Sequence, residues 1–99
     1  MSQPRQLDSP LYRLIRNENV AGFNAQKPPE GEIDLCHGDF RGLDLRTLDA
    51  ARVRFTDAYF RGADLRGLDL RDTCMQGASL AHAQISGTYF PEELSADEI

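Results

Sequence analysis

The sequence predicts an all-β fold in which the chain winds into a stack of coils. Three observations predict it. An apolar residue occupies every fifth position across residues 33–90, a small or apolar residue usually stands two positions before it, and glycine recurs two positions after it. A period of five fits neither a strand, with period two, nor a helix, with period 3.6. The apolar positions, called centres below, are Leu35, Phe40, Leu45, Ala50, Phe55, Phe60, Leu65, Leu70, Met75, Leu80, Ile85 and Phe90.

Each repeat is expected to bury two side chains and to expose the one between them. The centres form the predicted core, together with the residues two positions before them, while the intervening residue is polar in most repeats and is expected to face outward. Ala50 is the only small centre, and the large Leu48 lies two residues before it, so one side chain fills the volume that the other leaves. The recurring glycines mark corners, where a residue without Cβ turns the chain at low cost.

Two segments carry a resemblance to a known family. Ala63-Asp64-Leu65-Arg66-Gly67 and Leu68-Asp69-Leu70-Arg71-Asp72 follow the pattern Ala, Asp or Asn, Leu and two variable residues. The chain therefore resembles the pentapeptide-repeat family over residues 33–90. The resemblance implies a right-handed, quadrilateral parallel β-helix with one pentapeptide per side, so that twelve repeats make about three coils. It also implies that residues twenty apart stack directly above one another, as with Phe40 and Phe60.

The flanking segments are expected to cover the open ends of this β-helix, because an open end leaves backbone groups and core exposed. Within residues 1–32, Ser9 has the position of a helix N-cap and Pro10 that of the first helical residue. A second short helix is predicted around Val20 and Phe23. Lys27-Pro28-Pro29-Glu30-Gly31 then breaks helical structure and leads into the first coil.

Residues 91–99 follow the repeat and allow two interpretations. Pro91 ends the pattern, and Ser95-Ala96-Asp97-Glu98 has the spacing of a capping box that opens a helix. The segment is either the start of a capping helix or an acidic tail. A homodimer formed through a terminal cap is one possible assembly.

Composition excludes several classes of function. No stretch has the ~18 to 20 apolar residues of a membrane span, and the amino terminus lacks the apolar core of a signal peptide, so a cytoplasmic protein without a membrane partner is expected. Two cysteines, Cys36 and Cys74, agree with a reducing compartment. No metal site, cofactor or catalytic set is predicted, because the aspartates lie on a convex solvated surface and no spacing suits a metal. The chain is therefore predicted not to be an enzyme.

The candidate partner-binding residues lie on the outer surface of the repeats. An arginine follows the centre in five repeats, and Tyr59 is expected to project outward beside two of them. The structural interpretation is a lattice of Asp and Arg side chains, each pair contributing little. The functional interpretation is an arginine-rich face that binds an acidic protein partner. The candidate residues are Arg41, Arg46, Tyr59, Arg61, Arg66 and Arg71.

Two functions follow, of different classes. The first is a non-enzymatic protein-protein interaction or scaffold module that acts through these Arg- and Asp-lined sides, with a protein partner of unknown identity. The second is implied by the resemblance, since some members of the family imitate DNA and thereby modulate or protect DNA gyrase. Residues 33–90 carry seven arginines and eight aspartates, so they lack the dense acidity that imitation needs. Nucleic-acid binding is disfavoured by a net charge of −5.

Overall fold

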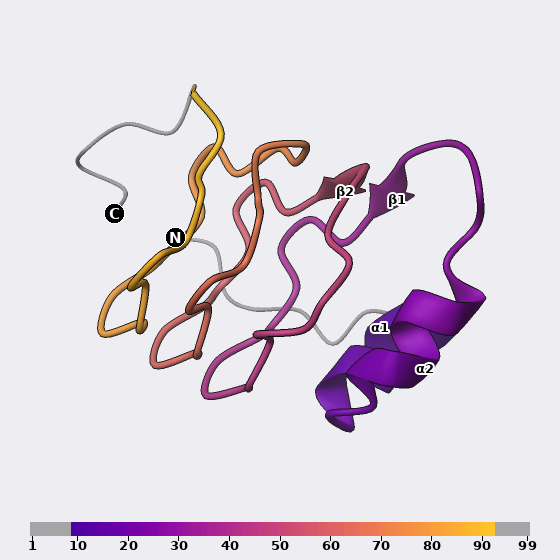
Figure 1. The fold of residues 1–99 in the computed structure, drawn as a ribbon, viewed down its shortest axis with the longest axis horizontal. Helices are drawn as coiled ribbons and strands as arrows, with labels where there is room; N and C mark the ends of the chain where they lie inside the picture. Colours follow the sequence, from indigo (N-terminus) through magenta and orange to yellow (C-terminus); the bar gives the residue numbers. More distant parts are fainter. Residues whose placement is uncertain (1–8, 93–99) are drawn as a thin grey trace.

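The computed structural model describes residues 9–92. The chain forms two helices, α1 (Pro10–Arg16) and α2 (Val20–Gln26), and then winds into stacked coils that contain two short strands, β1 (Ile33–Asp34) and β2 (Val53–Arg54). Figure 1 shows both helices at one end of the stack, with later residues progressively farther from them.

Consecutive coils are held in register by parallel pairing between residues twenty apart. β1 and β2 pair in this register, with Ile33 opposite Val53, and single bridges join Asp44 to Asp64 and Asp64 to Gln84. The backbone N–H of Asp64 donates to the carbonyl of Leu43 at 2.8 Å, and its carbonyl accepts from Leu45 at 2.9 Å. The predicted stacking is confirmed, and we call residues 33–52, 53–72 and 73–92 the first, second and third coils.

A turn closes each side of a coil. The carbonyl of a centre accepts a hydrogen bond from the N–H three residues later, as from Ala63 to Phe60 at 2.9 Å, and Gly62 between them has φ of +71°. The positive φ at this position turns the chain, so the corners predicted from the glycines are confirmed. Four residues other than glycine adopt the same conformation, which the sequence did not predict: His37, Arg52, Asp57 and His82.

These turns divide each coil into four sides. Side 1 comprises residues 33–37, 53–57 and 73–77, and side 2 comprises 38–42, 58–62 and 78–82. Side 3 comprises 43–47, 63–67 and 83–87, and side 4 comprises 48–52, 68–72 and 88–92.

The core lies inside the coils, as predicted, and aromatic rings fill the part nearest the helices. Phe40 stacks on Phe60 with ring centroids 5.3 Å apart and an interplanar angle of 19°, and Phe55 and Tyr12 meet Phe40 edge-on. Gly38 leaves room for this cluster, because a Cβ there would come within 2.8 Å of the Phe40 ring.

The last two predicted core residues differ from the rest. Ile85 and Phe90 are only partly buried, whereas the earlier centres are buried. They are the last two centres of the third coil, whose first two centres, Met75 and Leu80, are buried. Exposure of the core thus increases toward the last described residues of the third coil.

The predicted helical cap is present and packs on the first coil. Ser9 is the N-cap of α1 and accepts from the N–H of Tyr12 at 3.3 Å, with Pro10 as the first helical residue. Asn19 is the N-cap of α2 and accepts from the N–H of Gly22. The helices pack on one another and bury Tyr12, Ile15, Val20 and Phe23.

Polar side chains of the cap bind backbone groups of the first coil that face away from the second. The hydroxyl of Tyr12 donates to the carbonyl of Asp39 and accepts from its N–H, both at 3.3 Å. Asn24 accepts from the N–H of Asp49 at 2.7 Å and donates to the carbonyl of Thr47 at 2.9 Å. The cap thus supplies hydrogen bonds that a preceding coil would otherwise provide.

Arg52 fixes the linker between the cap and the first coil. Its Nη2 donates to the carbonyl of Pro28 at 2.6 Å and its Nη1 to that of Gly31 at 2.7 Å.

Two expectations from the sequence are not confirmed by the described residues. The all-β class is not confirmed, because the described chain contains two helices and its regular strands are only two residues long. The capping box at Ser95-Ala96-Asp97-Glu98 lies outside the described residues. None of the helices that the structure describes is long and apolar enough to cross a membrane.

Candidate interaction surface

Four of the five candidate arginines are each held by the aspartate two residues before them. Arg46 donates from Nε to Oδ1 of Asp44 at 3.0 Å and from Nη2 to Oδ2 at 2.8 Å. Arg66 makes the same two bonds to Asp64, at 2.9 and 2.8 Å. We call each such pair an Asp–Arg fork. The forks are Asp39–Arg41, Asp44–Arg46, Asp64–Arg66 and Asp69–Arg71.

The same aspartates also bind the backbone at the start of the turn. Oδ1 of Asp69 accepts from the N–H of Arg71 at 3.0 Å, and that of Asp34 accepts from the N–H of Cys36 at 3.0 Å. This Asx-type bond recurs at every aspartate that stands directly before a centre: Asp34, Asp39, Asp44, Asp49, Asp64 and Asp69. Aspartate at this position therefore has a structural role in each repeat.

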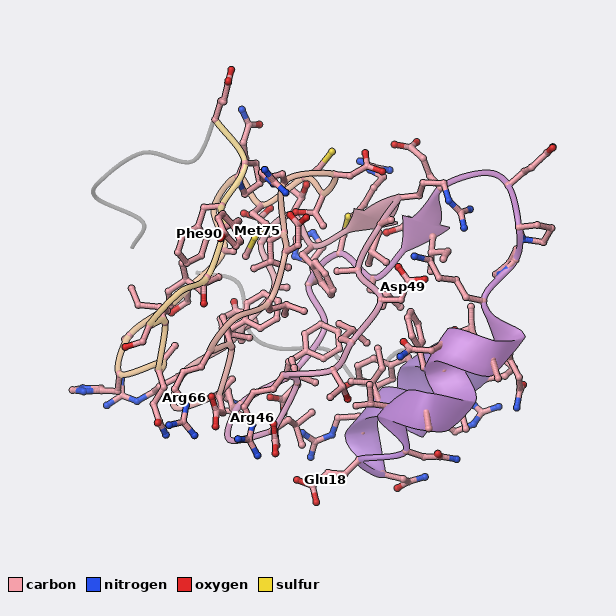
Figure 2. All side chains as sticks on the ribbon, viewed as in Figure 1. Glu18, Arg46, Asp49, Arg66, Met75 and Phe90 are labelled. Carbon is pink, nitrogen blue, oxygen red and sulfur yellow. The ribbon has the colours of Figure 1, made fainter. Side chains whose placement is uncertain are left out.

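On side 3 the forks also connect the first coil with the second. Nε of Arg46 lies 3.4 Å from Oδ2 of Asp64, so the carboxylate of the second coil lies between two stacked guanidinium groups. Figure 2 shows Arg46 and Arg66 along the same edge of the molecule. Asp44 and Asp64 thus supply the carboxylates that offset the repulsion between these two arginines.

The forks lower the pKa of their carboxyl groups. The side-chain hydrogen bonds from Arg41, Arg46 and Arg71 hold the pKa values of Asp39, Asp44 and Asp69 at about 2. Each fork satisfies Nε and Nη2 of its arginine within the chain. These four arginines therefore form a lattice of Asp and Arg side chains, as in the structural interpretation of the sequence.

Arg61 is the exception, because its repeat has Tyr59 where the other four have aspartate. Among residues 9–92 no carboxylate lies within ion-pair distance of Arg61, and its side chain is exposed. Tyr59 is half-buried and lies between Asp39 and Ser79 in the stack, as predicted. Side 2 thus combines an aromatic side chain with an arginine free for intermolecular contact.

Tyr89 adds a feature that the sequence analysis did not predict. Its side chain is exposed, at 56%, and the guanidinium of Arg71 lies 4.8 Å from its ring centroid. The sequence could have indicated this contact, because Asp69 and Tyr89 are twenty residues apart. They bridge one another, which places Tyr89 beside the fork of Asp69 and Arg71.

The two cysteines lie in different coils, Cys36 in the first and Cys74 in the third. Cys36 and Cys74 are both free thiols, and burial raises the pKa of Cys36. No group of three or more His, Cys, Asp or Glu in the described part of the chain could hold a metal ion.

Comparison with known proteins identifies the repeat. A family model described as pentapeptide repeats matches residues 32–67 and 54–90, with eight copies. These matches together span more than half of the chain. Searches of curated proteins and of solved structures gave no significant match. With its five-residue period, its coils of twenty residues and this match, the chain belongs to the pentapeptide-repeat family.

Proposed function

We propose that this protein is a non-enzymatic module that binds an acidic surface of another protein through side 2. Its family consists in general of non-enzymatic structural or interaction modules, whose repeats build right-handed quadrilateral β-helices. We also propose that the β-helix of this protein is right-handed and that the protein is cytoplasmic.

The observation that supports this proposal is the presence, on one side, of Tyr59 and of Arg61, an arginine with no carboxylate partner among residues 9–92. Binding through a fork arginine would compete with its own aspartate, whereas Arg61 can form its first ion pair with a partner. Tyrosine and arginine, together with tryptophan, are enriched among interface hot spots. The stacked coils hold both in place, which reduces the ordering cost of binding.

The gyrase alternative has less support. Imitation of DNA needs exposed, unpaired negative charge, and the four forks neutralise four of the aspartates on the coils. A supercoiling assay with purified gyrase addresses it directly, and we expect no inhibition or protection at micromolar protein.

The test compares charge reversals at two arginines for which the described part of the chain provides no ion pair. Arg61→Glu and Tyr59→Ala alter side 2, while Arg54→Glu makes the same charge change on side 1. Affinity capture from a lysate of the parent organism, read by mass spectrometry, should retain a partner on the wild type and on Arg54→Glu. Retention should fall at least tenfold on Arg61→Glu and on Tyr59→Ala.

Circular dichroism of each variant checks that the coils remain folded. Reversal of a fork arginine is unsuitable here, because it would remove the two side-chain hydrogen bonds that the arginine donates to its aspartate. Equal retention of every protein by Arg61→Glu and Arg54→Glu would refute binding through side 2.

A further inference from the structure

A cleft separates the helical cap from the first coil on side 3. It has a volume of about 680 Å³, and its lining includes Glu18 and Ala21 from the cap and Asp44, Arg46 and Thr47 from the coil. Figure 2 shows Glu18 and Arg46 along the same edge of the molecule, where the helices meet the coils. This volume lies within the roughly 300–1,000 Å³ that is typical of binding clefts.

The cleft exposes the backbone N–H and carbonyl of Asp44, which form no hydrogen bond with another described residue. Because Asp64 exchanges hydrogen bonds with Leu43 and Leu45, the N–H and carbonyl of Asp44 point away from the second coil, toward the cap. At Asp39 and Asp49 the cap supplies partners for the equivalent groups. No described residue supplies one at Asp44.

The charge on the cap side of the cleft is also unbalanced. No cation among residues 9–92 lies within ion-pair distance of Glu18, whereas Asp44 and Arg46 neutralise each other. Glu18 follows α1 with φ of +60°, a conformation that glycine adopts at lower cost. The cleft thus presents one free carboxylate next to one free backbone donor and acceptor.

We propose that this cleft binds an extended segment of a partner protein that carries a basic side chain. The segment would pair with the N–H and carbonyl of Asp44, one strand spacing of about 4.8 Å below the first coil, as a preceding coil would. Its Lys or Arg would pair with Glu18. This surface is separate from side 2, so the inference does not depend on the proposed function.

The test uses peptides and a variant that fills the cleft. A library of acetylated, amidated heptapeptides is screened against the full chain, and enriched sequences are measured by fluorescence anisotropy. Enriched peptides should share a basic residue. Affinity should fall at least tenfold for Ala21→Arg, which blocks the cleft, and remain within twofold for Ala25→Arg, an exposed alanine on the same helix outside the cleft.

Two further comparisons separate backbone pairing from charge. N-methylation of the central peptide residues should weaken binding at least tenfold, because it removes the backbone donor. Glu18→Gln should remove the preference for a basic residue, and Glu30→Gln on the exposed linker should retain it.

Three results would overturn the proposal. The first is the absence of any enriched peptide, and the second is binding that Ala21→Arg and Ala25→Arg affect equally. The third is a self-association in analytical ultracentrifugation that Ala21→Arg abolishes, which would assign the cleft to a second copy of the chain. Because Ala21→Arg leaves Tyr59 and Arg61 unchanged, failure here leaves the side 2 test intact.

Discussion

At the scale of single residues, aspartate and arginine form a local unit that stabilises four of the corners. The aspartate before a centre accepts from the backbone N–H two residues later and, in four repeats, from the arginine side chain at that position. A separation of two residues places both groups on the same outer surface. The sequence motif Asp-x-Arg thus encodes a turn and its surface charge together.

These forks predict that the protein loses stability in acid. Their carboxyl groups have folded-state pKa values below the ordinary 3.8, at about 2 for Asp39, Asp44 and Asp69. The unfolded chain therefore binds protons first, so this stabilisation is complete above about pH 5 and is lost as pH falls from 4 to 2. Urea unfolding by circular dichroism at several pH values measures it.

A pair of variants checks which carboxylates cause the loss of stability in acid. Asp69→Asn should reduce the slope of stability against pH between 4 and 2, because one fork no longer titrates. Asp72→Asn changes an exposed aspartate that forms no ion pair among the described residues, and should leave that slope unchanged. An equal reduction in both variants would contradict a specific role for the fork.

At the scale of elements, the helical cap replaces a missing coil. Asn24 uses its amide as a peptide group would, accepting from the N–H of Asp49 and donating to the carbonyl of Thr47. Tyr12 does the same at Asp39 with a single hydroxyl. Helices shorter than about twelve residues are marginal alone, so α1 and α2 depend on this docking.

Asn24→Ala should therefore weaken the joint between cap and coil. Two hydrogen bonds at a solvent-accessible joint predict a loss of about 1–2 kcal/mol in the free energy of unfolding. Gln26→Ala, at an exposed position of the same helix, should change it by less than about 0.5 kcal/mol. Urea denaturation compares the two, and equal effects would show that Asn24 contributes no more than helix propensity.

At the scale of the whole molecule, stability should depend on a twenty-residue register. Each coil pairs only with its neighbours, as in other solenoids, so the number of interfaces between coils sets the stability. Within the third coil the core is buried at Met75 and Leu80 and only partly buried at Ile85 and Phe90.

Duplicating residues 53–72 inserts one whole coil and should preserve the register. The free energy of unfolding and its dependence on urea should both rise, because one more coil is buried between neighbours. Duplicating residues 53–62 adds half a coil, places each side over the wrong one, and should lower stability. If both insertions had the same effect, the twenty-residue register would not be the source of stability.

Much of the fold follows from the sequence because the determining signals lie within five residues. The apolar centres, the glycines that accept a positive φ and the Ser9-Pro10 helix start are local features, and each was predicted correctly. The presence of Tyr59 in place of an aspartate was likewise visible. Its consequence for Arg61 became clear only once the fork geometry was known.

The sequence by itself determined the period and the set of candidate residues, and its resemblance to the pentapeptide-repeat family implied the stacking register. The tertiary structure decided which arginines are free, which cap side chains bind the first coil, and where the cleft beside Asp44 lies. These features join residues about twenty or more positions apart, as with Asn24 and Asp49 or Glu18 and Arg46. Their relative placement is fixed by the packing of the helices on the coils, which no local pattern encodes.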